Sequence, residues 1–197
     1  MKATLRRREV VSSLLENRKK LLVVAGLGST AWDITAAGDS PRSFPLWGAM
    51  GQAAMIGLGL ALAQPRRRVL VITGDGEMLM GLGSLATIGV QQPANLTVAV
   101  IDNERYGETG MQATHTASGV DLAAVACGCG IRSSEVVFSS DRVFQLRKLI
   151  HEKPGPHFLQ IKVVAEKLPL VLPPLDGAHL AARFRRALLP DVLAKKR

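Results

Sequence analysis

The sequence has little of several residue types, and each shortage excludes a class of protein. Only two of its 197 residues are cysteines, and aromatic residues make up 4%. Cys127 and Cys129 are one residue apart, so they cannot readily bridge each other, and no nearby His or Cys completes a four-ligand metal site with them. We expect both to be small buried residues in a reducing, cytoplasmic compartment.

A hydrophobic run long enough to cross a membrane is also absent. The run AMGQAAMIGLGLALA spans residues 49–63 and contains Gln52, whereas a membrane helix needs about 20 apolar residues. The start of the chain does not resemble a signal peptide, because the arginines at 6–8 are followed by polar residues and Glu16. We expect no membrane segment, and we expect residues 49–63 to form a helix buried on most sides.

Acidic residues are outnumbered, with 16 Asp and Glu against 25 Lys and Arg and a net charge of +9. Such a surplus can attract nucleic acid or another polyanion. The basic residues, however, are clustered mostly at chain ends and in turns, and no recognised nucleic-acid module accompanies them. We expect solvated surface, or attraction to an acidic partner subunit or an anionic substrate, and no nucleic-acid partner. The clusters are residues 6–8, 19–20, 66–68, 183–186 and 195–197.

What the sequence does contain is a regular alternation of apolar runs and helix-like segments. The run VLVITGDG at 69–76 is apolar almost throughout, as in strands that are buried on both faces. Alternation of this kind predicts an α/β fold with a doubly wound, mostly parallel sheet. Strands are expected at 21–28, 69–76, 96–103, 135–138 and 157–164, and helices at 4–20, 49–63, 77–91, 121–130 and 140–152. Loops are expected at 29–47 and 104–118.

Proline sets the C-terminal region apart. The segment LPLVLPP at 168–174 contains three prolines, so it cannot be a regular helix, and we expect an extended arm. A final basic helix is expected over 177–190. We therefore expect one domain over residues 1–165 and a C-terminal extension over residues 166–197.

One glycine motif near the N-terminus is a false lead. Residues 26–31, GLGSTA, match the G-x-G-x-x-A pattern of dinucleotide-binding proteins. That pattern requires an acidic residue at the end of a second strand about 20 residues later, where this sequence has Ser43, Phe44 and Pro45. We expect instead a tight turn that exposes its backbone near a site.

The segment Gly74-Asp75-Gly76 is a better candidate. Asp-Gly pairs mark many turns, but here a buried strand carries Asp75 to the carboxyl edge of the sheet, where ligands gather. Gly76 would let the backbone approach a ligand, and the helix from Glu77 would offer free N–H groups to a phosphate. Asp75 could hold a divalent cation beside that phosphate, and Mg²⁺ suits a site of one or two protein oxygens plus phosphates.

Asn103 completes this pattern. It follows Gly76 after 26 intervening residues, the length of one helix and one strand. The chain therefore returns to the neighbouring strand end, where we expect Asn103 to face Asp75. The segment 103–107 should then turn sharply.

The glycine–aspartate–glycine triplet followed by 26 residues and Asn103 resembles the thiamine diphosphate motif. With LWGAMGQAAMIGLGLALA and DNERYGETGMQATHT, residues 20–130 are similar to the diphosphate-binding (β) subunit of sulfopyruvate and phosphonopyruvate decarboxylases. The resemblance implies a PP-type thiamine diphosphate-binding domain, with thiamine diphosphate and Mg²⁺ as cofactors. It also implies a carbon–carbon lyase that decarboxylates a 2-oxo acid.

The resemblance assigns roles to individual residues. It implies that Asp75 and Asn103 bind Mg²⁺ through side-chain oxygens and that Arg105 adds its backbone carbonyl. Residues implied to surround the diphosphate are Gly74, Gly76, Glu77, Tyr106 and Gly107. Met50 would be the large apolar residue that forces the cofactor into its bent shape, although the position alone would suggest a core methionine in a helix. The carbonyl of Gly48 would accept a hydrogen bond from the cofactor's amino group.

The loop after Asn103 supplies the candidate catalytic residue, His115. A lone histidine in a loop is usually at the surface, but the resemblance places this loop over the reacting carbon. His115 would bind the substrate's anionic group or assist proton transfer. Arg42 and Arg105 are further candidates to attract that group, and Glu108 and Gln112 share the loop.

A carboxylate that contacts the cofactor's pyrimidine ring is missing. In the family it comes from a separate pyrimidine-binding domain, so the resemblance implies a partner α subunit that supplies the catalytic Glu. We expect a hetero-oligomer, or a homodimer when the chain is isolated. The alternatives are a carboligase or oxidoreductase subunit of the same cofactor class, or a non-catalytic thiamine diphosphate-binding protein. The oxidoreductase β subunits that carry iron–sulfur clusters need more cysteines than this sequence has.

Overall fold

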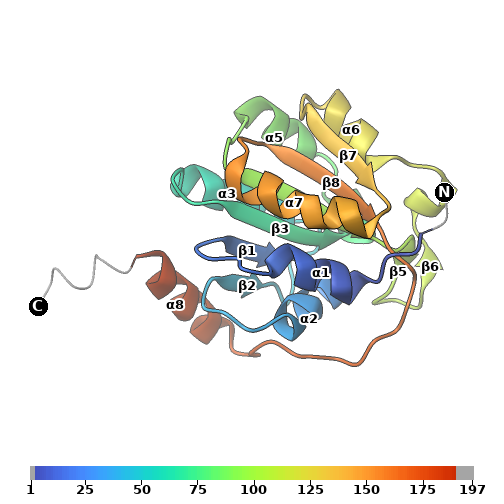
Figure 1. The fold of residues 1–197 in the computed structure, drawn as a ribbon. Helices are drawn as coiled ribbons and strands as arrows, with labels where there is room; N and C mark the ends of the chain where they lie inside the picture. The colour runs from blue at the N-terminus through green and yellow to red at the C-terminus, as the bar shows by residue number, and fades with distance from the viewer. Residues whose placement is uncertain (1–2, 190–197) are drawn as a thin grey trace, which may run out of the picture.

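The computed structural model describes residues 3–189, and a six-stranded sheet forms their centre (Figure 1). The strand order is β2-β1-β3-β4-β8-β7, and every neighbouring pair is parallel. The strands are β1 (Leu22–Ala25), β2 (Ser43–Pro45), β3 (Val69–Gly74), β4 (Leu96–Asp102), β7 (Ser133–Val137) and β8 (His157–Lys162). The predicted parallel α/β fold is confirmed.

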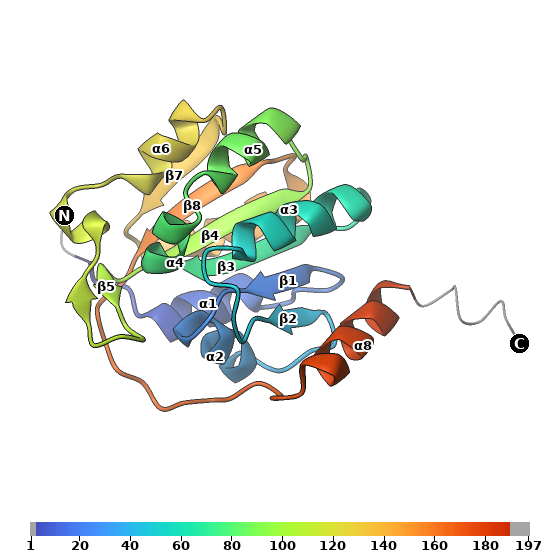
Figure 2. The same cartoon turned by 180° about the vertical axis from the view of Figure 1, so that it is seen from behind.

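Helices cover both faces of the sheet, so the sheet is doubly wound as predicted (Figures 1 and 2). One face carries α1 (Arg7–Leu15), α2 (Ser29–Ala36) and α7 (Ser140–Glu152). The other face carries α3 (Ala53–Ala63), α4 (Asp75–Met80), α5 (Ser84–Gln91) and α6 (Leu122–Gly128). A last helix, α8 (Gly177–Leu188), lies beside β2.

Successive residues of the central strands enter two separate cores. In β3, Val71 packs into the core under α3 and α5, whereas Leu70 and Ile72 pack into the core under α1 and α7. All seven residues of β4 are buried. Burying one such aliphatic side chain stabilises the fold by about 1.5–3 kcal/mol. Because both faces are covered, these strands are apolar throughout rather than alternating.

The helix expected at 49–63 is shorter than predicted. It begins at Ala53, and residues 49–51 form a turn in which Ala49 and Gly51 have φ of 59° and 83°. Most residues of the helix are buried or partly buried, as expected, and Leu62 on the outer face is 50% exposed. Close packing fixes the turn, because a Cβ on Gly81 would lie 1.9 Å from the Gly51 carbonyl oxygen. That contact falls where the helix predicted at 77–91 is divided into α4 and α5.

The two segments predicted as loops contain short strands. Residues 29–47 include helix α2 and the edge strand β2, and residues 104–118 include the hairpin of β5 (Arg105–Tyr106) and β6 (Gln112–Ala113). A 3₁₀ helix follows at His115–Ser118. Elements this short depend on pairing with distant residues, as when β2 pairs with β1, and so leave little periodic signal in the sequence. The cysteine prediction is also wrong, because Cys127 is exposed and Cys129 is only partly buried.

The C-terminal segment runs along the domain rather than away from it (Figure 1). The arm is extended as predicted and is held where Arg8 Nη2 donates to the Pro169 carbonyl at 2.8 Å and Trp47 Nε1 to the Pro174 carbonyl at 2.9 Å. Helix α8 buries Phe184, whose ring centre is 5.3 Å from that of Phe44. The division into residues 1–165 and 166–197 stays a prediction, and residues 190–197 lie outside the described residues.

Among residues 3–189, no helix combines the length and the hydropathy that a membrane crossing needs.

Candidate active site

A cleft opens at the carboxyl edge of the sheet, where β3 and β4 end side by side. Gly74, the last residue of β3, pairs with Ile101 of β4, so the residues that follow each strand meet at one place. Nine of the predicted site residues line this cleft. They are Met50, Gly74, Asp75, Gly76, Glu77, Asn103, Arg105, Tyr106 and Gly107. Leu27 also lines it, which confirms the expected turn near a site.

Asp75 is the buried carboxylate of the cleft. It is 1% exposed, its Oδ2 accepts a hydrogen bond from Thr114 Oγ1 at 2.5 Å, and Thr116 Oγ1 lies 3.2 Å from the same oxygen. Burial raises the pKa of Asp75 to about 6, with a smaller contribution from the charge of Asp102, although the Thr114 hydroxyl acts in the opposite direction. A cation beside Asp75 would favour its charged form.

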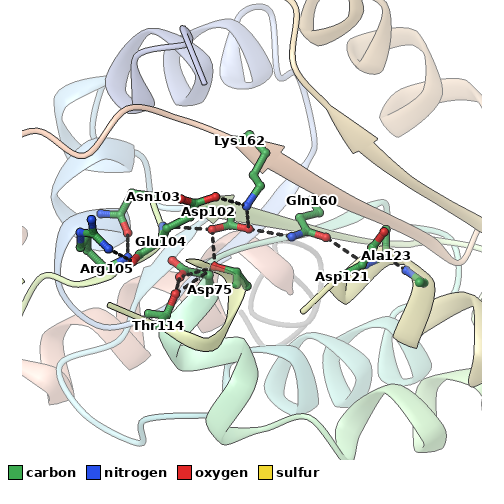
Figure 3. Close-up of polar contacts among 12 residues, drawn as sticks. Asp75, Asp102, Asn103, Glu104, Arg105, Thr114, Asp121, Ala123, Gln160 and Lys162 are labelled. Atoms are coloured by element: carbon green, nitrogen blue, oxygen red, sulfur yellow. Dashed lines mark hydrogen bonds and ion pairs between the residues drawn. The ribbon is translucent and has the colours of Figure 1, made fainter. Parts of the chain in front are cut away.

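A second carboxylate, Asp102, lies behind Asp75 and is held from three sides (Figure 3). It is fully buried, and Thr116 Oγ1 lies 2.8 Å from its Oδ1. Its Oδ2 accepts from Gln160 Nε2 at 2.6 Å and lies 3.0 Å from Lys162 Nζ. Thr116 has one proton for two carboxylates. The shorter distance assigns that proton to Asp102, while Thr114 donates to Asp75.

Lys162, on β8, supplies the positive charge that offsets these acids. Its Nζ also lies 2.6 Å from Glu104 Oε1. Burial disfavours the charged form of Lys162, but hydrogen bonds to Glu104 and Asp102 outweigh it and raise the pKa of the ammonium. The carboxyl edge therefore contains a connected polar network rather than isolated acids.

Asn103 begins the sharp turn that the sequence predicts. Its Oδ1 accepts the backbone N–H of Arg105 at 2.9 Å, while Asp102 Oδ1 accepts that of Glu104 at 3.0 Å. Glu104 has φ of 61°. A carbonyl oxygen has two lone pairs, so Asn103 Oδ1 keeps one for a further partner.

Position 76 has to be glycine because the Tyr106 ring packs directly against its backbone. A Cβ at this position would lie 2.6 Å from the Tyr106 ring, so any side chain would push Tyr106 away from the first turn of α4. Helix α4 begins at Asp75 rather than at Glu77 as predicted. The glycine thus lets the loop after β4 close against the helix after β3.

Glu77 lies beneath the turns on the other side of the cleft. It is 8% exposed, and its Oε2 accepts a hydrogen bond from Thr73 Oγ1 at 2.7 Å. Burial raises the pKa of Glu77, against the Thr73 hydroxyl and the backbone amides of Ala53 and Gly51. The one hydrogen bond of the carboxylate connects α4 to the end of β3, and Glu77 Oε1 is buried without a partner among residues 3–189.

Met50 lines the cleft, but three other predicted residues, Gly48, His115 and Arg42, do not. Met50 projects from the turn and is 46% exposed, whereas Gly48 is not among the cleft-lining residues. His115 is exposed, with Nδ1 3.5 Å from the Tyr106 hydroxyl, and it does not line the cleft either. Arg42 precedes β2 at the opposite edge of the sheet and lines a different pocket, so the expectation that it attracts the substrate is wrong.

The residues that sequence reasoning did not single out are those that hold the carboxylates: Asp102, Thr114, Thr116, Gln160 and Lys162. The signal was present in the segment Thr114-His115-Thr116. Successive side chains in this segment point to opposite sides of the chain, so the two threonines lie on one side and the histidine on the other. The threonines are buried and the histidine is exposed.

The fold and the cleft together define an α/β cofactor-binding domain with its site at the carboxyl ends of parallel strands. Residues 28–161 match the family described as "Thiamine pyrophosphate enzyme, C-terminal TPP binding domain", and the chain belongs to this family.

Named relatives agree with this assignment. Sulfopyruvate decarboxylase subunit beta of Methanothermobacter thermautotrophicus is 38% identical over 176 residues, which cover 89% of this chain and 90% of that protein. Its namesake from Methanocaldococcus jannaschii is 42% identical over 127 residues, 64% of this chain and 67% of that one. Phosphonopyruvate decarboxylase of Streptomyces viridochromogenes is 38% identical over 173 residues, 87% of this chain but 43% of that protein.

A solved structure has the same fold. Benzoylformate decarboxylase from Polynucleobacter necessarius superposes with a TM-score of 0.70 at 21% identity, and the match covers 84% of this chain and 34% of that one. At this identity the superposition shows the fold alone, whereas the sulfopyruvate and phosphonopyruvate decarboxylases at 38–42% identity indicate a thiamine diphosphate-dependent decarboxylase, a carbon–carbon lyase.

The cleft fits the cofactor of the family, thiamine diphosphate with Mg²⁺. Asp75 is a buried carboxylate whose direct hydrogen-bond donors are neutral hydroxyls, and Asn103 offers an amide oxygen nearby. No group of three or more His, Cys, Asp or Glu residues in the described part of the chain could hold a metal. Mg²⁺ is usually held by one or two carboxylates together with phosphate oxygens and waters, so it would need no such group.

Proposed function

We propose that this chain is the diphosphate-binding subunit of a 2-oxo acid decarboxylase of the sulfopyruvate or phosphonopyruvate type. A pyrimidine-binding partner chain would complete the active site and supply the catalytic Glu. The observation that carries the proposal is the convergence of Asp75, Asn103 and Arg105 on one cleft with the Gly76 turn and Met50.

Each of these residues has a role in the proposal. Asp75 and Asn103 hold Mg²⁺ with side-chain oxygens, and Arg105 holds it with its carbonyl. The backbone at Gly76 and Glu77 contacts the diphosphate. When bound, the cofactor supplies the electron sink for decarboxylation, and the protein supplies binding, orientation and electrostatics.

The proposal of a partner chain is supported by the relatives that are named as beta subunits. The chain covers 90% of a relative that is named as a beta subunit but 43% of the phosphonopyruvate decarboxylase. The missing part of the longer relative is large enough for a pyrimidine-binding domain. The exposed Met50 lies at the open side of the cleft, where a second subunit would cover it.

Arg105 is the best candidate in this chain to attract an anionic substrate group such as a sulfonate or phosphonate. It lines the cleft, and its Nη1 donates to the carbonyl of Glu104 rather than to a carboxylate. Arg7 also lines the cleft, but its Nη1 lies 2.7 Å from Asp33 Oδ2, so its charge is already matched. His115 stays a candidate for proton transfer only if its loop closes over the cleft.

The test is purification of the native complex on a tag attached to this chain, followed by a screen of 2-oxo acids for release of carbon dioxide. We expect a partner of similar size that carries the missing Glu, and decarboxylation that requires both chains, thiamine diphosphate and Mg²⁺. The proposal fails if the chain alone is fully active, or if the complex releases carbon dioxide from no 2-oxo acid.

A carboligase of the same cofactor class is the second candidate. The acetolactate synthase isozyme 1 large subunit of Escherichia coli is 28% identical over 138 residues. Product analysis in the presence of a second carbonyl compound separates the two functions, since a decarboxylase releases an aldehyde and a carboligase retains it in a longer product.

A further inference from the structure

A second pocket lies at the amino edge of the sheet, on the opposite side from the cleft. Three of its cationic residues lie one or two positions before a parallel strand: Lys20 before β1, Arg42 before β2 and Arg67 before β3. Arg183 and Arg186 reach it from α8. In Figures 1 and 2, α8 lies at the end of the sheet away from β5 and β6. The pocket has a volume of about 470 Å³.

The charged residues that line this basic pocket are all positive. Besides the five Lys and Arg residues, it includes His179 and no carboxylate. Asp39 lies close by, but both its oxygens pair with Arg183, at 2.5 Å and 3.0 Å. Among residues 3–189, one acid therefore faces five cations, and the other four form no ion pair there.

The guanidinium groups are also short of hydrogen-bond partners. Within residues 3–189, the Nε atoms of Arg42, Arg67 and Arg183 are buried and have no acceptor. Nη2 of the neighbouring Arg18 is also buried and has no acceptor among these residues. Buried donors are normally paired, and a charged donor left unpaired is costly. Burial lowers the pKa of Arg18, while the charge of Asp39 raises it and the charge of Arg42 lowers it to a smaller extent.

We propose that this basic pocket binds a small organic polyanion that carries phosphate groups. Planar guanidinium groups match phosphate oxygens in pairs, and such hydrogen bonds between charged groups are strong. Convergence of residues from three strand ends and one helix gives a concave site rather than a flat face. A volume of this size suits a small ligand, whereas a nucleic-acid duplex needs an extended basic surface.

The site is independent of the cofactor cleft and of the proposed function. Arg66 and Arg185 offer a matched control, because each is the chain neighbour of a pocket residue, is exposed and does not line the pocket. Arg42 and Arg186 are the best positions to change. Neither side chain forms a hydrogen bond or ion pair with another described residue, so their removal should not affect the fold.

The experiment titrates inorganic tripolyphosphate by calorimetry into the full chain saturated with thiamine diphosphate and Mg²⁺, so that the cleft is already occupied. We expect one binding site, weakened about tenfold or more in Arg42→Gln/Arg186→Gln, since hydrogen bonds between charged groups are stronger than those between neutral groups. Arg66→Gln/Arg185→Gln removes the same charge and should bind within about twofold of wild type. Thermal unfolding of both variants checks that they fold.

The proposal is overturned if the two double variants weaken binding equally, because the effect is then one of overall charge. It is also overturned if tripolyphosphate does not bind, or if a short DNA duplex binds in its place and Arg42→Gln/Arg186→Gln removes that binding. In the last case the surface is a nucleic-acid site.

Discussion

The two edges of the sheet carry opposite charges, and they differ in whether those charged groups have hydrogen-bond partners. At the carboxyl edge, Asp75 and Asp102 are buried acids that accept hydrogen bonds from threonine hydroxyls, a glutamine and a lysine. At the amino edge, the guanidinium groups of Arg42, Arg67 and Arg183 have buried nitrogens without acceptors in the described chain.

The two acids at the carboxyl edge are therefore already hydrogen-bonded within the protein. The unpaired nitrogens of the amino-edge pocket would find their acceptors in a bound ligand. The ligand proposed for the carboxyl edge is an anionic diphosphate, which buried acids would repel without a cation between them. The amino edge would take an anion directly. Metal dependence should therefore distinguish binding at the two edges.

Asp75→Asn tests this difference most strongly. The substitution keeps the shape of the side chain and removes the charge that would hold Mg²⁺, so we expect thiamine diphosphate affinity in the assembled complex to fall by roughly 100-fold or more. Calorimetry with and without Mg²⁺ measures the change. Asp141→Asn, at an exposed position in α7, is the control with the same charge change.

Asp75→Asn should leave tripolyphosphate binding at the amino edge unchanged. If Asp75→Asn binds thiamine diphosphate as tightly as wild type, the carboxyl edge does not need a cation at Asp75 and the contrast between the edges is lost.

Met50→Ala examines orientation rather than affinity at the carboxyl edge. If Met50 forces the bent shape of the cofactor, its truncation should lower kcat by up to about 100-fold, since misplacement by about 1 Å can cost that much. Affinity for thiamine diphosphate should change little, and Met50→Leu should restore most of the rate. Carbon dioxide release and calorimetry on the complex separate the two quantities. A Met50→Ala enzyme with wild-type kcat would show that Met50 is only part of the subunit surface.

Thr116→Val should have a smaller effect, through the network behind the cleft. The change keeps the side-chain shape but removes the hydroxyl that lies between Asp75 and Asp102. We expect thiamine diphosphate affinity to fall about tenfold, the usual effect of losing a partner of a metal ligand. We also expect a stability loss of about 1 kcal/mol from the lost hydrogen bond, because Asp102 Oδ1 keeps only the backbone N–H of Glu104 as a donor.

Thr87→Val, on the exposed face of α5, is the matched control and should alter neither quantity. Equal stability and affinity in Thr116→Val and wild type would mean that the carboxylates are held without this hydroxyl. Thiamine diphosphate calorimetry and urea unfolding provide the two measurements.

Sequence reasoning succeeded where a residue's place depends on its own strand or helix. The helix over 140–152 was predicted with its observed ends, and Asp75 and Asn103 reach the same edge because the connection between their strands has the right length. A buried parallel strand is recognisable from its continuous apolar run, and the strand end then fixes where the next residue lies.

Reasoning failed where a residue's place depends on contacts between distant segments. Arg42 was assigned to the substrate because of its charge, although the edge at which it lies is set by β2, a three-residue strand that pairs with β1. The pairing of Thr116 with Asp102, and the meeting of Arg67 with α8, likewise join segments far apart in the chain. No local pattern reports such contacts.

His157→Gln is expected to give the smallest effect, and it concerns the amino edge, where His157 begins β8. The ring is 5% exposed, and its Nδ1 lies 2.7 Å from Ser133 Oγ. Burial lowers the pKa of His157 below its usual 6.5, and the positive Arg68 adds to this, against the Lys153 carbonyl.

The unfolded chain then binds a proton at His157 more readily than the folded chain does, so this residue makes stability fall as pH decreases below about 6.5. Asp75, whose pKa burial raises to about 6, acts in the opposite sense and makes stability fall as pH rises. Urea unfolding over a pH series should show a shallower loss at low pH in His157→Gln, by at most about 1.4 kcal/mol per pH unit. An unchanged slope in His157→Gln would mean that the buried ring accepts a proton as readily as a free one, and the positive amino edge would then have no measurable effect on its nearest buried base.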